Sequence, residues 1–160
     1  MPRVQLACTF KVVYEEKDVN LVMVVINSRA KRIEEFRIIV DNGRAHSVCL
    51  DLPPETGTNM GPTAFELVVM SFAGCVATMF TFMAKKMRVS ISDLDVRVKA
   101  EKPEDARTVT RANFDMIVKT GESEERIKRV WDQARKNCPV GVLFEQAGVQ
   151  VDYKLKIAKE

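Results

Sequence analysis

The amino-acid sequence predicts an α+β fold in which antiparallel strands at both ends of the chain flank one long apolar helix. Two observations lead to this prediction. Stretches in which apolar and polar residues alternate with a period of two lie on either side of an uncharged run at residues 67–84. Strands and helices also do not alternate regularly, which argues against a βαβ arrangement. With 160 residues, the chain is predicted to form a single domain over residues 1–160.

The N-terminal third is predicted to consist of strands. Apolar and polar residues alternate over residues 4–14, and a β-branched run follows at 21–26. Residues 27–32 are interpreted as a basic bend. Asn42-Gly43 is a dipeptide typical of hairpins. It is predicted to join the next two strands, 36–40 and 47–52.

A loop rich in proline and glycine, residues 53–62, leads into the long apolar helix that is predicted within the stretch 61–87. The helix is apolar on every side, and Cys75 lies in its middle. A helix of this kind must be buried in lipid or in the centre of a sizeable core. Lys85 and Lys86 suit its C-terminal end.

The C-terminal half is predicted to add a hairpin, a kinked helix and a last strand. Residues 94–100 and 112–118 alternate as an antiparallel hairpin with one face in water. A second helix starts near Glu122 and must kink or restart at Pro139. The last helical segment, 140–147, is followed by Gly148 as its C-terminal cap and by a strand at 149–157.

Composition excludes several classes of function. The 25 basic and 22 acidic residues are mixed along the chain, so we expect no nucleic-acid partner. The N-terminus lacks an apolar leader, and we expect a cytoplasmic location. The four cysteines are widely spaced and His46 is the sole histidine, so we expect neither a metal site nor a cofactor. Cys8 and Cys49 are interpreted as incidental thiols.

Two cysteines remain as candidates for chemistry. Cys138 directly precedes Pro139, which favours the first position of a helix, so Cys138 is predicted to be an N-cap. Backbone N–H groups and the helix dipole stabilise a thiolate there, and Arg135 and Lys136 are nearby cations. Cys75 lies in apolar surroundings that disfavour a thiolate. The residues alone therefore nominate Cys138 as the more acidic thiol, and leave open whether the two form a reactive pair or are inert core residues.

Two motifs together resemble the OsmC/Ohr family of osmotically inducible and organic hydroperoxide resistance proteins. These are the stretch GPTAFELVVMSFAGC, which ends at Cys75, and NCPVGVLFEQAG, which begins one residue before Cys138. The strand order around them also agrees, so the likeness covers most of the chain. The resemblance implies an intertwined homodimer, with long helices packed centrally and curved antiparallel sheets wrapped around them. Such a dimer would bury a helix that is apolar on all sides.

The resemblance also implies thiol-dependent reduction of organic hydroperoxides. Cys75 would be the peroxidatic thiol that becomes a sulfenic acid, and Cys138 would resolve it to a disulfide. A cellular dithiol of the lipoyl or thioredoxin type would then reduce that disulfide. Glu66 would orient the cation that holds Cys75 as thiolate.

This sequence departs from the better-characterised branches of the family in two places. Their helix carboxylate stands ten residues before the cysteine, where this chain has Phe65, and Glu66 stands nine before. Their activating arginine comes from an N-terminal loop or strand. The candidates for it here lie in no matching motif: Arg29, Arg32, Arg37 and Arg44. We therefore expect a divergent member.

Two other readings stay open. One is a non-enzymatic protein of the same fold that acts as a redox-responsive partner or binds a hydrophobic small molecule. The pocket of such a binder would be lined by Met70, Phe72, Met79, Phe80 and Phe82. The other is a membrane protein that spans the bilayer once at residues 67–84. The flanking strands, each with one face in water, argue against this reading.

Overall fold

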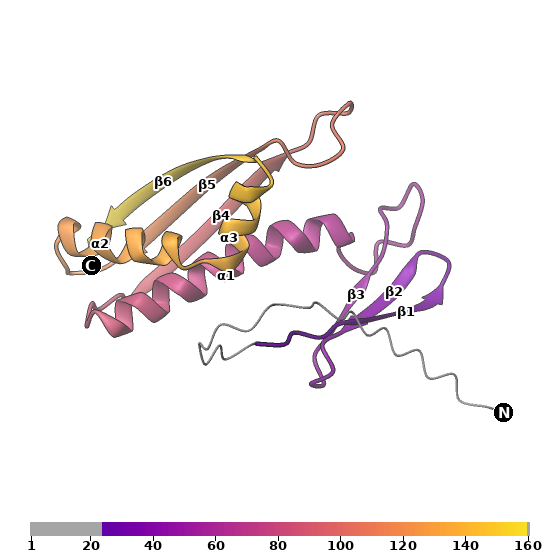
Figure 1. Ribbon diagram of the computed structural model, residues 1–160, viewed down its shortest axis with the longest axis horizontal. Coiled ribbons are helices and arrows are strands. Elements are labelled where there is room, and N and C mark those ends of the chain that lie inside the picture. Colours follow the sequence, from indigo (N-terminus) through magenta and orange to yellow (C-terminus); the bar gives the residue numbers. More distant parts are fainter. Residues whose placement is uncertain (1–23, 160) are drawn as a thin grey trace, which may run out of the picture.

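The computed structural model describes residues 24–159 and confirms the α+β fold (Figure 1). The predicted strand at 4–14, with Cys8, lies outside the described residues. The elements in chain order are β1 (Arg29–Glu34), β2 (Arg37–Asp41), β3 (Ser47–Leu50), α1 (Ala64–Lys86), β4 (Asp93–Glu101), β5 (Arg111–Lys119), α2 (Glu124–Lys136), α3 (Pro139–Gln146) and β6 (Gln150–Ala158).

Strands β1, β2 and β3 form an antiparallel sheet beside the N-terminal end of α1 (Figure 1). The hairpin predicted at Asn42-Gly43 is confirmed. Asp41 pairs with Ser47, and the Asn42 N–H donates to the His46 carbonyl at 3.2 Å. Gly43 has a φ of 71°, the left-handed conformation for which glycine is suited.

The strand predicted at 21–26 and the bend predicted at 27–32 are wrong where the structure describes them. Residues 24–28 belong to no strand, and the basic residues that follow form β1. Pairing decides this outcome, because β1 lies against β2, whereas the β-branched run has no partner strand among residues 24–159. All six residues of β1 are exposed. Its sequence, RAKRIE, also lacks the alternation of apolar and polar residues that indicates a half-buried strand.

Helix α1 begins at a capping box. The Thr63 hydroxyl accepts from the Glu66 N–H at 3.1 Å, and the Glu66 carboxylate accepts from the Thr63 N–H at 2.7 Å. A cap of this kind contributes about 1 kcal/mol to stability. Lys85 and Lys86 occupy the last turn, as expected. The helix is long and apolar enough to cross a membrane by length and composition alone.

In this chain α1 is buried on one face rather than all round. Its buried residues are Phe72, Val76, Phe80, Met83 and Ala84. Other apolar side chains of α1 are exposed, among them Val68, Met70 and Phe82. A single chain therefore does not bury α1 on all sides, although its apolar sequence led us to expect such burial.

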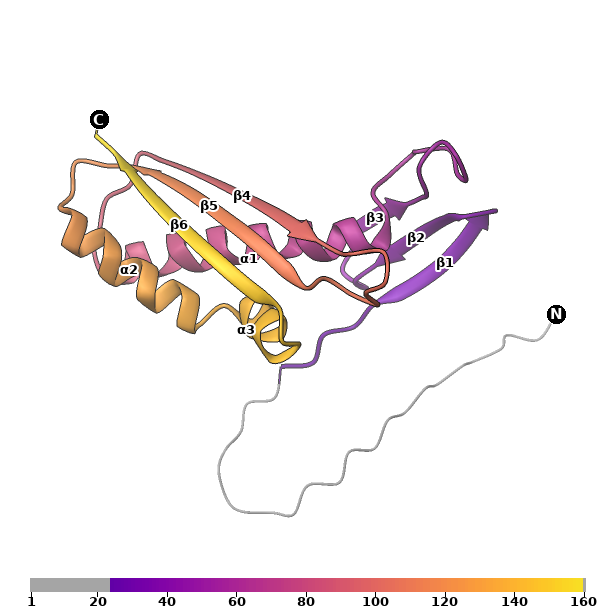
Figure 2. The same ribbon diagram turned by 90° about the horizontal axis from the view of Figure 1, so that it is seen from above.

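Strands β4, β5 and β6 form the second sheet, with β5 in the centre, and it lies over α1 and α2 (Figure 2). Strands β4 and β5 make the predicted antiparallel hairpin. Strand β6 pairs with β5 in parallel, so the sheet is mixed and not antiparallel throughout. The reason is that α2 and α3 carry the chain back along the sheet before β6 starts.

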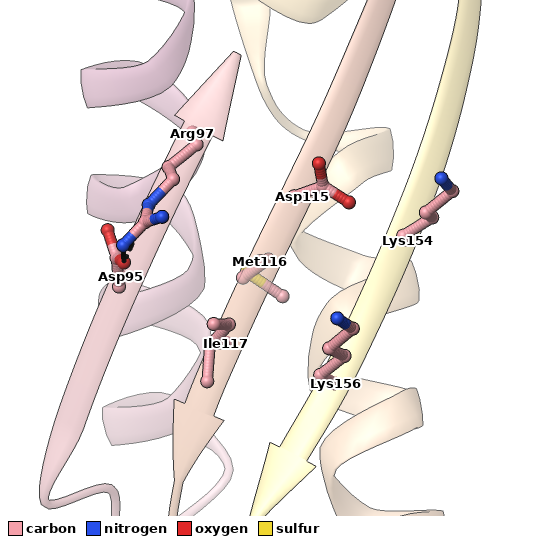
Figure 3. A pocket seen from close by; sticks show the side chains of 7 residues that line it. All are labelled: Asp95, Arg97, Asp115, Met116, Ile117, Lys154 and Lys156. Atoms are coloured by element: carbon pink, nitrogen blue, oxygen red, sulfur yellow. Dashed lines mark hydrogen bonds and ion pairs between the residues drawn. The ribbon is translucent and has the colours of Figure 1, made fainter.

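The outer face of this sheet is charged, as the alternation of β4 predicted. Asp95, Arg97, Asp115, Lys154 and Lys156 surround a hollow of about 430 Å³ there (Figure 3). Arg97 and Asp95 form an ion pair at 2.7 Å. Because charges of both signs alternate across the strands, we interpret this face as a solvated surface.

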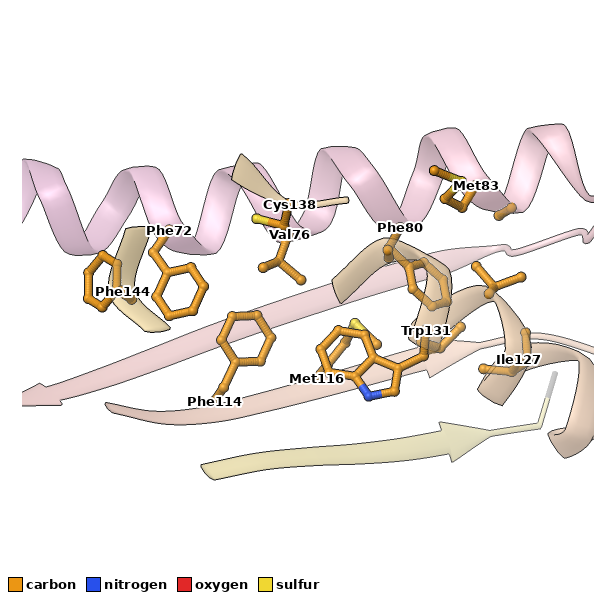
Figure 4. Packing of buried hydrophobic residues seen from close by; sticks show 14 of the residues in the cluster. Phe72, Val76, Phe80, Met83, Phe114, Met116, Ile127, Trp131, Cys138 and Phe144 are labelled. Carbon is orange, nitrogen blue, oxygen red and sulfur yellow. The ribbon is translucent and has the colours of Figure 1, made fainter. Parts of the chain in front are cut away.

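The core lies between the inner face of this sheet and the helices (Figure 4). Phe114 and Met116 of β5 meet Phe72 and Phe80 of α1, and Trp131 of α2 closes one side. Each fully buried large side chain contributes about 1.5–3 kcal/mol. This packing fixes α1 against α2 and α3, and so fixes the positions of Cys75 and Cys138.

Candidate active site

Cys138 stands at the junction of two helices. Helix α2 ends at Lys136 with Asn137 as its C-cap, and Pro139 occupies the first position of α3, so Cys138 is the N-cap of α3, as predicted. Its sulfur accepts a hydrogen bond from the Gly141 N–H at 3.3 Å. The side chain is 1% exposed.

Cys75 lies on α1, one turn after Phe72, and is partly exposed. Its Sγ atom is 3.0 Å from the Sγ atom of Cys138, although 63 residues separate the two in the chain. A disulfide requires a sulfur–sulfur distance of about 2.05 Å, so the two atoms need to approach by about 1 Å to bond. The structure thus brings together the two cysteines that the sequence nominated.

The two thiols differ in environment. Burial first, and the hydrogen bond with Cys75 second, raise the pKa of Cys138 to about 11. The N–H groups of Gly141 and Val140 oppose this effect but are outweighed. The expectation that the N-cap position lowers the pKa of Cys138 is therefore wrong, because desolvation exceeds the stabilisation by the helix terminus.

The cation expected to help Cys138 is directed elsewhere. The guanidinium of Arg135 lies 4.8 Å from the centroid of the Tyr153 ring and 5.8 Å from that of Trp131. A guanidinium over an aromatic face is held there by the ring quadrupole. Arg135 therefore covers an aromatic pair at the end of α2.

Close packing between α1 and α3 holds the sulfurs together. The Phe72 and Phe144 rings stack with their centroids 4.5 Å apart. Gly141 sits so near that a Cβ atom there would lie 3.4 Å from the Phe72 ring and 3.5 Å from the Cys138 sulfur. Sequence reasoning did not single out Gly141, although its place three residues after an N-cap cysteine was a usable signal.

Glu66 does not contact Cys75 within one chain. Nine residues along a helix correspond to a rise of about 13 Å and to half a turn, so the two side chains point to opposite sides of α1. The carboxylate serves the helix start instead, where hydrogen bonds with Thr63 lower the pKa of Glu66. Its role in orienting a cation stays a prediction.

Of the four candidate arginines, Arg37 is the most firmly held. Its Nη2 atom donates to the Thr58 hydroxyl at 2.8 Å, and its Nη1 atom lies 3.4 Å from Glu34. The Nε atom is buried and has no acceptor among residues 24–159. Arg32 donates to the Glu35 carbonyl, and Arg29 and Arg44 are exposed.

A buried carboxylate organises the loop that holds Arg37. Asp51, 3% exposed, accepts from the N–H groups of Leu52, Thr58 and Met60 and from the Thr58 hydroxyl. These bonds, the Thr58 hydroxyl first among them, lower the pKa of Asp51 to about 2. Sequence reasoning missed this network. The sequence feature that could have indicated the network is an aspartate directly before a loop rich in proline, glycine and threonine.

The arrangement is suited to thiol chemistry. Cys75 is the sulfur that a reagent from solvent meets first, and Cys138 lies behind it within bonding reach. No group of three or more His, Cys, Asp or Glu side chains among residues 24–159 is placed to hold a metal ion.

Cys75 and Cys138 both lie in a region of the chain that matches a known protein family. The sequence profile of the family described as OsmC-like protein matches residues 57–154. Protein YhfA of Escherichia coli K12 is 27% identical over 126 residues, which cover 76% of this chain and 91% of that protein.

Solved structures share the fold. The OsmC like protein from Mycoplasma pneumoniae superposes with a TM-score of 0.75 at 16% identity, over 84% of this chain and 98% of that one. An organic hydroperoxide resistance protein OsmC from Legionella pneumophila gives a TM-score of 0.63 at 16% identity, over 86% and 98%. An organic hydroperoxide resistance protein from Elizabethkingia anophelis gives 0.64 at 13%, over 88% and 99%.

Proposed function

Because this chain belongs to the OsmC-like protein family, we propose that it protects against peroxides as a thiol-dependent reductase of organic hydroperoxides. The observation that carries this proposal is the 3.0 Å separation of the Cys75 and Cys138 sulfurs. Two structures of the same fold are named organic hydroperoxide resistance proteins, which is consistent with it.

The first step takes place at Cys75, the more exposed sulfur. Its thiolate attacks the terminal peroxide oxygen, the O–O bond breaks, and Cys75 becomes a sulfenic acid. The departing alkoxide takes a proton from water and leaves as the alcohol. The sulfur is oxidised by two electrons, and the peroxide is reduced by the same two.

Cys138 resolves the sulfenic acid. Its sulfur attacks the Cys75 sulfur, the S–O bond breaks, and one water molecule is released as the disulfide forms. A cellular dithiol of the lipoyl or thioredoxin type then restores both thiols by exchange and is itself oxidised to a disulfide. Because Cys138 is buried, we propose that this resolution is intramolecular and competes well with external thiols.

We propose that the working unit is a homodimer. The apolar side chains on the exposed face of α1 need a cover, and a second copy of α1 supplies one of matching chemistry. In such a dimer, we propose that Glu66 and Arg37 of one copy lie near Cys75 of the other. A guanidinium there would favour the thiolate form of the nucleophile.

The experiment that tests the function measures both turnover and product. The purified protein is supplied with tert-butyl hydroperoxide and either dihydrolipoamide or thioredoxin. Consumption of peroxide is expected, with loss of two hydrogen atoms from the intact protein by mass spectrometry. Cys75→Ser should abolish turnover, whereas the matched control Cys49→Ser should not. If neither dithiol supports consumption by the wild type, the proposal fails.

The alternative function, binding of a hydrophobic small molecule, is weakened by burial. Phe72 and Phe80, which were predicted to line its pocket, are both 0% exposed and belong to the core. Met70 and Phe82 are exposed, but on the face of α1 that we assign to the dimer. A ligand that co-purifies with a protein unreactive to peroxide would restore this alternative.

A further inference from the structure

We propose that Cys138 has a second role that precedes disulfide formation: in the reduced protein its thiol donates a hydrogen bond to the Cys75 sulfur, 3.0 Å away, and so holds Cys75 as the thiolate nucleophile. This inference rests on the proposed function and deepens it. It makes the resolving cysteine a positioning group for the attacking one.

The direction of the hydrogen bond follows from the partners of Cys138. Its sulfur already accepts from the Gly141 N–H at 3.3 Å. A thiol has one proton to donate, and among residues 24–159 the Cys75 sulfur is the side-chain partner bonded to the Cys138 sulfur. The proton of Cys138 is therefore directed at Cys75, and Gly141 fixes the sulfur in that orientation.

Burial decides which sulfur carries the charge. Cys138 is 1% exposed, whereas Cys75 is partly exposed, so a negative charge costs less desolvation on Cys75. The pKa of Cys138, raised to about 11 with burial as the largest cause, agrees with this assignment. A hydrogen bond to an ionised acceptor is also stronger than one between neutral groups.

The charged groups on the neighbouring elements do not supply this effect. On α1 the nearest ionisable side chains are Glu66 and Lys85, at opposite ends of the helix. At the end of α2, Arg135 lies over the Tyr153 ring of β6, and Lys136 is exposed. Glu145 of α3 is exposed as well. Among residues 24–159, the group bonded to the Cys75 sulfur is therefore the neutral thiol of Cys138.

The chemistry of turnover is unchanged by this role. While Cys75 attacks the peroxide, Cys138 keeps its proton. Cys138 gives that proton up when its sulfur attacks the sulfenic acid, and the proton and the departing hydroxide together make the one water released. The N–H of Gly141 remains in place to stabilise the sulfur as it loses its proton.

The test compares Cys138→Ala with Cys138→Ser. Both variants lack the resolving sulfur, so neither can form the disulfide, but only serine retains a donor. The measurement is the rate of Cys75 alkylation by iodoacetamide, followed on the Cys75 peptide by mass spectrometry across a range of pH. At neutral pH we expect alkylation on the order of tenfold slower in Cys138→Ala than in Cys138→Ser, with its pH profile displaced upward.

Alanine also leaves space at this buried position, so a second pair of equal size is included. Cys138→Val and Cys138→Thr differ only in the hydroxyl, and the same order of rates is expected. Circular dichroism and thermal melting confirm the fold of each. Equal alkylation rates within both pairs would overturn the inference.

The outcome is separable from that of the proposed function. Donor-dependent alkylation in a protein whose wild type consumes no hydroperoxide would leave the hydrogen bond standing and remove the peroxidase. If the wild type consumes hydroperoxide but the alkylation rate in the variants does not depend on the donor, the peroxidase stands and the proposed hydrogen bond is removed.

Discussion

The rings of Phe72 and Phe144 stack with centroids 4.5 Å apart, and this contact ties α1 to α3 beside the two thiols. Phe72 stands one turn before Cys75, and Phe144 stands on the short helix that Cys138 caps. Both rings are buried. The distance between two sulfurs far apart in the chain is therefore set by an aromatic contact that carries no chemistry itself.

The first prediction concerns this contact. Phe144→Ala is expected to lower the free energy of unfolding by about 3–5 kcal/mol, because it removes a buried ring from a packed site. It should also slow formation of the Cys75–Cys138 disulfide by diamide. Ile117→Ala, at an exposed position on the outer face of β5, is the control and should leave the rate of disulfide formation unchanged. Equal rates in Phe144→Ala and wild type would contradict this prediction.

The second prediction compares two glycines. A Cβ atom at Gly61 would lie 1.9 Å from the Cys49 carbonyl oxygen, so Gly61→Ala must displace the chain that enters α1. At Gly141 the nearest contact would be 3.4 Å, and alanine favours a helix over glycine by about 1 kcal/mol. Urea unfolding should show Gly61→Ala strongly destabilised and Gly141→Ala unchanged or slightly stabilised. Similar losses in both variants would count against the packing described here.

Sequence patterns predicted the parts of this fold that depend on local chemistry. Asn42-Gly43, Pro139 and Gly148 marked a hairpin, a helix start and a helix end, because each acts through its own backbone. The edge strand β1 was missed because its pairing with β2, and not its composition, makes it a strand. The parallel pairing of β6 with β5 was also not predicted, because it too depends on pairing and not on composition.

The sequence nominated the two thiols that the structure places side by side, but it did not predict the electrostatics around Cys138. The motifs around Cys75 and Cys138 identified both thiols, since a cysteine directly before proline already indicates an N-cap. The sequence could not show that Cys138 is buried, and burial reverses the expected effect on its pKa. The buried Asp51 network also depends on contacts between loops, which no local pattern encodes.

The third prediction follows from the low pKa of Asp51. Its pKa falls from 3.8 to about 2 in the folded protein, so the carboxylate stabilises the fold above its ordinary pKa and loses that effect as pH falls toward 2. Asp51→Asn should therefore melt at a lower temperature than wild type near neutral pH. The difference in Tm should shrink between about pH 4 and pH 2. Asp132→Asn, at an exposed site on α2, serves as the control, and a difference independent of pH would contradict the assignment.

The fourth prediction tests the homodimer. Val68 is 46% exposed on the apolar face of α1. Placing a carboxylate in an apolar interface would cost several kcal/mol, so Val68→Glu should convert a dimer to a monomer. Light scattering after gel filtration measures the mass of each species. Gln133→Glu, at an exposed position on α2, adds the same single charge and serves as the control. A wild type that is monomeric at all concentrations would refute the proposed assembly.

The last prediction separates two roles of Glu66. Its carboxylate caps α1 through the Thr63 N–H, and the side-chain amide of Glu66→Gln would retain an acceptor there while losing the charge. Glu66→Gln should therefore keep the melting temperature of the wild type, whereas Thr63→Ala should lose about 1 kcal/mol of stability. If Glu66 also orients a cation at Cys75 of a second copy, Glu66→Gln will reduce peroxide consumption at unchanged stability. Full turnover in that variant would leave Glu66 with the cap alone.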